Sequence, residues 1–282
     1  MSLIISIPFY SSIVAYLAAA ALALRFVRAG DPALLIRSKH AAALGNTLLL
    51  VVFVYRWVHY GRLPLTGLGD PLNLFLVMCA GIILIVQRDE HMRPVMTYYM
   101  PALAILAVVS GVFSPPYLAE SPKELNGFLL SIHVVLVFFA FALFFVASLT
   151  SMAYVSKAQS LKRRTAGGLS ARLPSLEQID KTLFRLIGVG YPAFAVTLVL
   201  GFSWAFMQRE EATGFWFASP RIILALVMVV FYASSFHIRR MGLLRGPKLA
   251  YLVFFVSTAL FVSYLGIELM QMGGYNFGGS SS

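Results

Sequence analysis

Residues 128–155 read FLLSIHVVLVFFAFALFFVASLTSMAYV, a run that contains no Asp, Glu, Lys or Arg. Because about 20 consecutive apolar residues suffice for a helix to cross the hydrocarbon core of a bilayer, this stretch predicts a membrane-spanning helix. The sequence as a whole predicts an all-α, polytopic membrane protein with about eight transmembrane helices, since only helices and closed barrels satisfy the backbone in lipid. The other predicted spans lie at 3–24, 41–55, 71–86, 95–113, 183–207, 220–238 and 249–270.

The composition supports this class. Hydrophobic residues make up 60% of the chain, charged residues only 12%, and the mean hydropathy is +0.83. A soluble domain carries about 25% charged residues. No basic segment or cleavage site of a signal peptide precedes the first span, so we expect it to be a retained helix. We expect residues 1–272 to form a single transmembrane domain, with a core at about 50–272, and the Gly/Ser-rich residues 273–282 to form a flexible tail.

The net charge of +11 is distributed unevenly along the chain. Such a bias marks cytoplasmic loops, so the pattern predicts that both termini lie outside and that the basic loops contact anionic lipid headgroups. The charge therefore points to the lipid bilayer and argues against nucleic acid as a partner. Of the 22 Lys and Arg residues, 16 lie in the connections at 25–40, 87–94, 156–182 and 237–248.

The longest polar connection, 156–182, contains the start signal of a helix. Ser175 is followed three residues later by Gln178, a capping-box spacing, so we expect a helix to begin there and to run into the sixth span. The single cysteine, Cys79, lies inside the third span and is expected to be a packing residue. One thiol excludes an internal disulfide and a CxxCH site for covalent haem attachment to this chain.

Between the second and third spans, residues 56–71 read RWVHYGRLPLTGLGDP. A loop that only joins two membrane spans does not need this aromatic, basic and Pro/Gly-rich sequence. We therefore interpret residues 56–71 as a functional outer loop. Guanidinium groups pair bidentately with carboxylates, and those on this side would suit the propionates of a haem. Simple anchoring at the interface is the alternative for each of Arg56, Arg62, Arg209 and Arg221.

Two histidines and one aromatic segment are candidates for a haem site. His133 begins the fifth span on the outer side, and His237 ends the seventh span near the inner side. A neutral imidazole ligates haem iron well, although an interfacial residue bonded to water, lipid or a neighbouring helix is the alternative. On the outer side, Phe215, Trp216 and Phe217 are typical either of the aromatic belt at the headgroups or of a platform for a flat porphyrin.

These segments resemble the cytochrome c assembly family, whose CcsA/HemX-like membrane proteins handle haem and carry a tryptophan-rich loop. The outer loop from Arg56-Trp57 to Asp70 is similar to the family's RW…G-x-x-PL-x-x-L-x-E/D segment. Three further stretches carry the likeness: the helix from His133 with Ser148 and Ser151, the segment Leu183–Pro192 leading to Gly201–Ala205, and the segment Phe231–Arg239.

The resemblance implies residue roles. His133 matches the outer-face histidine that precedes the tryptophan-rich loop, and His237 matches the membrane-embedded histidine that follows it. Because they lie near opposite faces, the two would serve different positions of haem b and would not clamp one iron. The apolar surface would come from Trp204, Phe215, Trp216 and Phe217. The outer-face arginines Arg56, Arg62 and Arg221 would meet the propionates, and Trp57 is a further candidate for haem binding.

The chain also departs from the family pattern. The family's W-x-W-D-P-K reads Trp216-Phe217-Ala218-Ser219-Pro220-Arg221 here. Asn276 stands near the place where a second outer histidine is expected. An amide is not among the usual axial ligands of haem iron, so this chain alone does not supply two outer histidines. These departures favour a HemX-like relative.

The leading hypothesis is a multi-pass protein of the bacterial inner membrane that binds or handles haem in cytochrome c assembly or haem metabolism, together with an assembly partner. The sequence shows no nucleophile–base pair, so we do not predict a free-standing enzyme. The alternative is a HemX-like regulator or scaffold that no longer binds haem and acts on a haem-synthesis enzyme through the connection 156–182. A transporter is disfavoured, because the spans hold almost no ionisable residues away from their ends.

Overall fold

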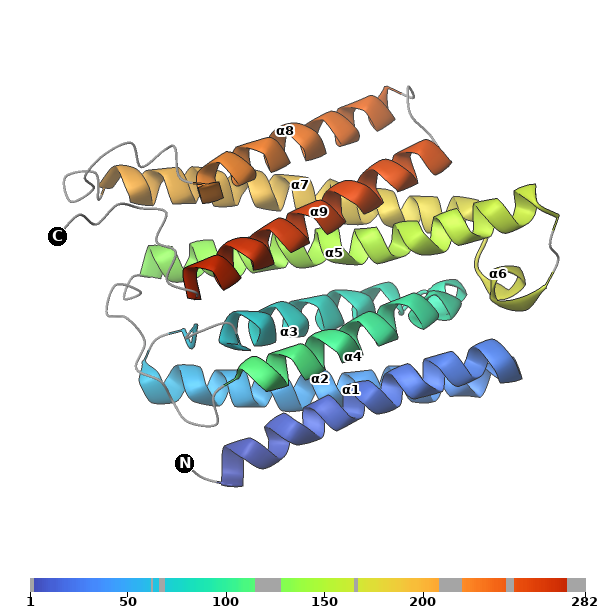
Figure 1. Ribbon diagram of the computed structural model, residues 1–282, viewed down its shortest axis with the longest axis horizontal. Coiled ribbons are helices and arrows are strands. Elements are labelled where there is room, and N and C mark those ends of the chain that lie inside the picture. Colours follow the sequence, from blue (N-terminus) through green and yellow to red (C-terminus); the bar gives the residue numbers. More distant parts are fainter. Residues whose placement is uncertain are drawn as a thin grey trace.

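The computed structural model describes residues 3–61, 63–65, 69–114, 128–164, 167–207, 220–241 and 246–272. All regular structure in these residues is helical, and the long helices run alongside one another as a bundle (Figure 1). They are α1 (Leu3–Ala29), α2 (Pro32–Tyr60), α3 (Gly69–Val86), α4 (Met96–Phe113), α5 (Phe128–Lys162), α7 (Leu176–Met207), α8 (Pro220–Arg240) and α9 (Pro247–Met272), with the short helices η1 (Glu90–Val95) and α6 (Gly168–Arg172).

The helices have the length and composition of membrane spans. In the described part of the chain six helices meet both criteria, and α8 and α9 contribute the shorter apolar segments Ile222–Ile238 and Pro247–Ser263. The all-helical, multi-pass class predicted from sequence is confirmed. Seven of the eight predicted spans each fall within one long helix, and the span 95–113 begins one residue before α4, at the last residue of η1. The number of helices that cross the membrane and the side of the termini stay predictions.

Helix caps explain why the second span was predicted too short. Hydropathy indicated 41–55, whereas α2 runs from Pro32 to Tyr60. The Asp31 carboxylate accepts the Ala33 N–H at 2.9 Å, and Pro32 supplies a first residue with a helical φ. Gly61, at φ +65°, ends the helix in the left-handed conformation. The polar ends of α2 are therefore helical because they are capped, although they are not apolar.

The bundle consists of α1–α4 and α5–α9, which meet mainly where α3 contacts α5 (Figure 1). An aromatic cluster joins the two parts: the rings of Phe75 and Phe145 have centroids 5.5 Å apart, and both contact Phe261 of α9. A buried hydrogen bond of 2.8 Å links Tyr99 to Thr150. Since the Thr150 hydroxyl donates to a backbone carbonyl of its own helix, Tyr99 is the donor in this bond.

The connection 156–182 is folded. Ser175 N–H donates to the Gln178 side chain at 3.1 Å, and Gln178 N–H donates to the Ser175 hydroxyl at 3.3 Å. The predicted capping box is thus confirmed, and α7 continues from Leu176 into the sixth span as one helix. Lys157 holds α6 by donating to the carbonyls of Ser170 and Leu173.

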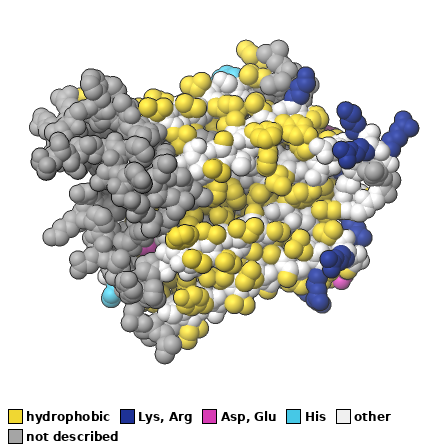
Figure 2. All heavy atoms as spheres, in the orientation of Figure 1, with side chains coloured by type: hydrophobic (Ala, Val, Ile, Leu, Met, Phe, Trp, Pro, Cys, Tyr) yellow, Lys and Arg dark blue, Asp and Glu magenta, His cyan; other side chains and the backbone are white. Residues whose placement is uncertain are grey.

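The side chains on the lateral surface of the bundle suit contact with lipid. Hydrophobic side chains cover its flank, and Lys and Arg gather at the end where α6 lies (Figure 2). Exposed apolar residues such as Val14, Val199 and Val230 are each about two-thirds exposed, as expected for side chains that face acyl chains. Inside, Cys79 is fully buried, which confirms its interpretation as a packing residue.

Candidate functional site

His133 lies near the start of α5, and its half-buried imidazole reaches across to α7. Nδ1 is 2.9 Å from the backbone carbonyl oxygen of Thr197. Because a carbonyl only accepts, Nδ1 carries the proton of the neutral ring, and Nε2 keeps its lone pair. Metal-ligating histidines are commonly oriented by such a bond from the other ring nitrogen. The geometry therefore presents a nitrogen suited to an iron ligand.

Gly201, one turn after Thr197, makes this approach of α5 to α7 possible. A β-carbon on Gly201 would lie 2.8 Å from His133 Cε1 and 3.6 Å from Nε2. Thr197 itself is 1% exposed, and its hydroxyl donates to the carbonyl of Phe194 at 2.7 Å. The backbone that accepts the histidine proton is consequently fixed within a packed region of α7.

His237 near the end of α8 is oriented differently. Its Nδ1 is 2.8 Å from the carbonyl oxygen of Ala233, one turn earlier in the same helix. The ring is exposed, and its neighbours are the edge-on rings of Tyr191 and Phe236, with centroids 6.5 and 5.7 Å away. Nδ1 is again the donor, so Nε2 again has a free lone pair.

The two histidines contact α7 at different residues. His133 contacts α7 at Thr197, and His237 contacts it at Tyr191. These positions are six residues apart, which corresponds to about 9 Å along the helix axis and about 240° around it. The two rings therefore meet α7 at different heights and on different faces, while their service of two separate haem positions stays a prediction.

The donor set suits an iron already held by a porphyrin. Among the described residues no three or more His, Cys, Asp or Glu side chains gather to hold a metal ion. Within the described residues, a bare ion at His133 or at His237 would have fewer than three ligands of these types. Haem iron needs only an axial ligand from the protein, and one imidazole lone pair supplies it.

The outer loop is closed by an ion pair that joins its two ends. Arg56 Nη1 is 2.5 Å from Asp70 Oδ1, Nη2 is 3.2 Å from Oδ2, and both side chains are buried. The guanidinium fork assigned from sequence to a haem propionate is thus engaged within the chain. Polar contacts continue from α3 to α4, where Asn73 donates to the Ser114 hydroxyl at 3.0 Å and accepts from Ser110.

The remaining predicted site residues are placed only in part. Trp57 is 42% exposed beside Arg56, and in the described part of the chain no hydrogen bond, ion pair or ring contact joins either residue to His133 or His237. Trp204 lies in α7 and Arg221 in α8, but their side chains are outside the described set. Also outside the described residues are Arg62, Phe215, Trp216, Phe217, Asn276 and the tail 273–282.

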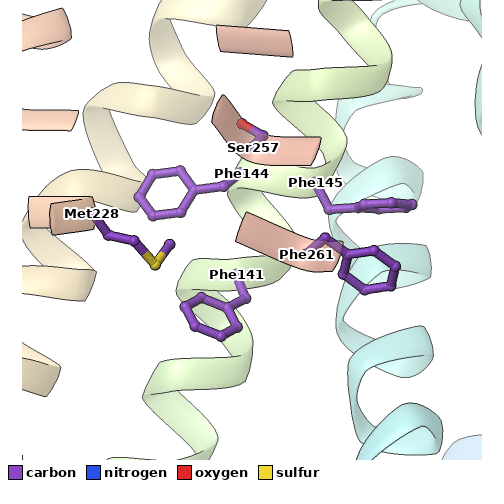
Figure 3. Close-up of a pocket in the computed structure, with 6 residues that line it drawn as sticks. All are labelled: Phe141, Phe144, Phe145, Met228, Ser257 and Phe261. Atoms are coloured by element: carbon purple, nitrogen blue, oxygen red, sulfur yellow. The ribbon is translucent and has the colours of Figure 1, made fainter. Parts of the chain in front are cut away.

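Sequence reasoning missed an apolar crevice between α5, α8 and α9. Its cavity volume is about 20 Å³, enough for about one water molecule and far below the range of small-molecule pockets. Two of its lining residues contact Tyr232, which stacks on Phe144 at 3.5 Å and whose hydroxyl is 2.6 Å from that of Ser257. No signal marked the crevice, because its residues lie within ordinary apolar spans. Figure 3 shows its lining: Phe141, Phe144, Phe145, Met228, Ser257 and Phe261.

Residues 37–274 match the family described as Cytochrome C assembly protein. Similar proteins include the cytochrome c biogenesis proteins CcsA of Prochlorococcus marinus (strain MIT 9303), 26% identical over 84% of this chain and 82% of that protein, and of Parasynechococcus marenigrum, 26% identical over 84% of each. CcsA of Heterosigma akashiwo is 22% identical over 86% of this chain and 84% of its own length. The match includes the outer loop and both histidines. The chain therefore belongs to the cytochrome c assembly protein family.

Proposed function

We propose that this chain is a haem-handling protein of cytochrome c biogenesis in a bacterial inner membrane. The family supports the process, and the hydrogen bond from His133 to Thr197 is the observation that carries the haem assignment. This bond leaves Nε2 of His133 able to ligate iron at the predicted outer end of α5. Haem b is the substrate in this proposal, and a protein thiol of an apocytochrome is its destination.

The chain's own residues have distinct roles in the proposal. His133 and His237 bind haem at two separate positions, the first near the outer end of the bundle and the second near the inner end. Arg56 holds the outer loop by its ion pair with Asp70, so propionate binding falls to Arg62 and Arg221. The aromatic residues Trp204, Phe215, Trp216 and Phe217, together with Trp57, supply apolar and rim contacts to the ring.

A partner protein completes the outer site. His133 would supply one ligand to haem iron, and Asn276, near the place where the family has a second outer histidine, is not among the residue types that usually ligate it. We propose that a cytochrome c assembly partner or the apocytochrome supplies the second ligand.

Hemin titration of the detergent-purified protein tests this function. The wild type should develop a Soret band, and His133→Ala and His237→Ala should each weaken hemin binding by about tenfold or more, since each removes an iron ligand. His91→Ala is the matched control, because His91 is an exposed histidine outside the proposed sites. A wild-type protein that neither carries haem nor binds added hemin would refute the proposal.

A HemX-like regulator of haem synthesis is the second candidate. It is favoured by the folded connection 156–182, where Lys157 is bonded internally while Lys162, Arg163 and Arg164 are exposed. Such side chains would bind an acidic surface of a soluble enzyme. Replacing these three exposed residues by Gln should abolish regulation in cells, whereas His133→Ala and His237→Ala should not. The opposite pattern favours the haem-handling function.

A further inference from the structure

The two candidate ligands are oriented in different ways, one by a bond within its own helix and the other by a bond to a neighbouring helix. His237 bonds to a carbonyl of its own helix, so this bond is present whenever α8 is helical. His133 bonds to a carbonyl that lies 64 positions away in the sequence, on α7. The orientation of His133 therefore depends on how closely α5 and α7 approach each other.

The closest approach is at Gly201. An added β-carbon would be 2.8 Å from His133 Cε1, whereas ordinary van der Waals contacts begin near 3.4 Å. The ring would therefore have to retreat by at least about 0.6 Å. A displacement of that size along the 2.9 Å bond to Thr197 would lengthen it to about 3.5 Å, at the outer limit of a hydrogen bond.

We propose that Gly201 is a positioning residue for His133. By leaving its Cβ position empty, it lets the imidazole seat against α7, where the Thr197 carbonyl takes the Nδ1 proton and keeps Nε2 unprotonated. The inference rests on the proposed function only for the identity of the ligand, because the seating of the ring is a property of the chain without haem. A larger residue at this position displaces the ring, so the Thr197 carbonyl no longer determines which of its nitrogens carries the proton.

Two glycines of the same helix provide matched controls. A β-carbon on Gly190 would be 2.7 Å from Phe144 Cε1, so Gly190→Ala disturbs the same α5–α7 interface by a similar overlap, away from His133. A β-carbon on Gly188 would meet Phe236 at 3.7 Å, an ordinary contact. Gly188→Ala therefore shows the effect of a glycine-to-alanine change in α7 without a steric overlap.

The experiment measures the histidine tautomer directly. Protein labelled with ¹⁵N-histidine is studied by NMR in detergent without haem, and the His133 signals are identified by their loss in His133→Ala. The wild type, Gly188→Ala and Gly190→Ala should show a protonated Nδ1 and an unprotonated Nε2 at His133, whereas Gly201→Ala should lose this pattern. Hemin titration should then show binding weakened about tenfold or more in Gly201→Ala alone.

Each outcome is decisive. Retention of the wild-type tautomer in Gly201→Ala, or an equal loss in Gly190→Ala, overturns the inference. A wild type with the expected tautomer and no hemin binding refutes the proposed function but leaves the positioning role intact. If Gly201→Ala does not fold, the double variant Gly201→Ala/His133→Ala should restore folding, because it removes the ring that overlaps the new methyl group. Absence of that rescue also overturns the inference.

Discussion

Replacing Asp70 by Asn should destabilise the protein by about 3–5 kcal/mol, because it leaves the Arg56 guanidinium buried without a counter-charge. The side chains of Arg56 and Asp70 are only 9% and 1% exposed, so solvent does not screen the pair. Both guanidinium Nη atoms bond to the carboxylate, and among the described residues Arg56 Nε has no hydrogen-bond partner. The loss of the carboxylate therefore leaves the cation without compensation.

The measurement is equilibrium unfolding in mixed detergent micelles, followed by circular dichroism of the helices. Arg56→Leu should also be strongly destabilising, since it removes the buried guanidinium that pairs with the Asp70 carboxylate. The double variant should cost at least about 2 kcal/mol less than the sum of the two single variants, because the residues act on each other directly. Arg93→Leu is the control: it breaks the Arg93–Glu90 pair, whose side chains are 27% and 73% exposed, and should cost less than about 1 kcal/mol.

Two results would refute this reasoning. One is an Asp70→Asn variant that is no less stable than Arg93→Leu, which would place the pair in contact with solvent. The other is strict additivity in the double variant, which would mean that the two side chains contribute separately. Either would remove the ion pair as the device that closes the outer loop.

Two further predictions concern contacts between distant parts of the chain. Tyr232→Phe should cost about 1–2 kcal/mol, since it removes a buried hydroxyl 2.6 Å from Ser257; an unchanged melting temperature in detergent would contradict this. Arg172 is exposed and donates to two carbonyls in the last turn of α1, so Arg172→Gln should cost less than about 1 kcal/mol and should speed proteolysis of the connection 156–182; equal cleavage rates in both proteins would show that the contact does not hold the connection.

Local signals in the sequence predicted the helices well. The apolar run 128–155 lies within α5, and the Ser175–Gln178 spacing marked the start of α7, because hydropathy and capping act over a few neighbouring residues. Helix ends were less accessible. α5 continues to Lys162, beyond the apolar run, since a polar segment that protrudes from the membrane can remain helical.

The contacts that define the candidate site were not accessible from sequence. Arg56 and Asp70 are visible as charges at the two ends of a loop, but their burial as a pair depends on how α2 and α3 pack. The bond from His133 to Thr197 joins residues 64 positions apart through a backbone carbonyl, which leaves no mark on residue identity. Gly201 carries the one signal available, a glycine inside a helix, where this residue is unfavourable unless packing requires it.

The different supports of the two histidines have a consequence for how mutations act on haem handling. A change that loosens the contact between α5 and α7 weakens the bond from His133 to Thr197 but leaves the bond from His237 to Ala233 intact, since the latter lies within α8. The His133 position should therefore be the more sensitive of the two to substitutions in the body of the bundle. Because α7 is one continuous helix, the placement of its N-terminal end by the Ser175 cap also bears on the position of the His133 ring. The stability of the bundle and the orientation of His133 are then linked through a single helix.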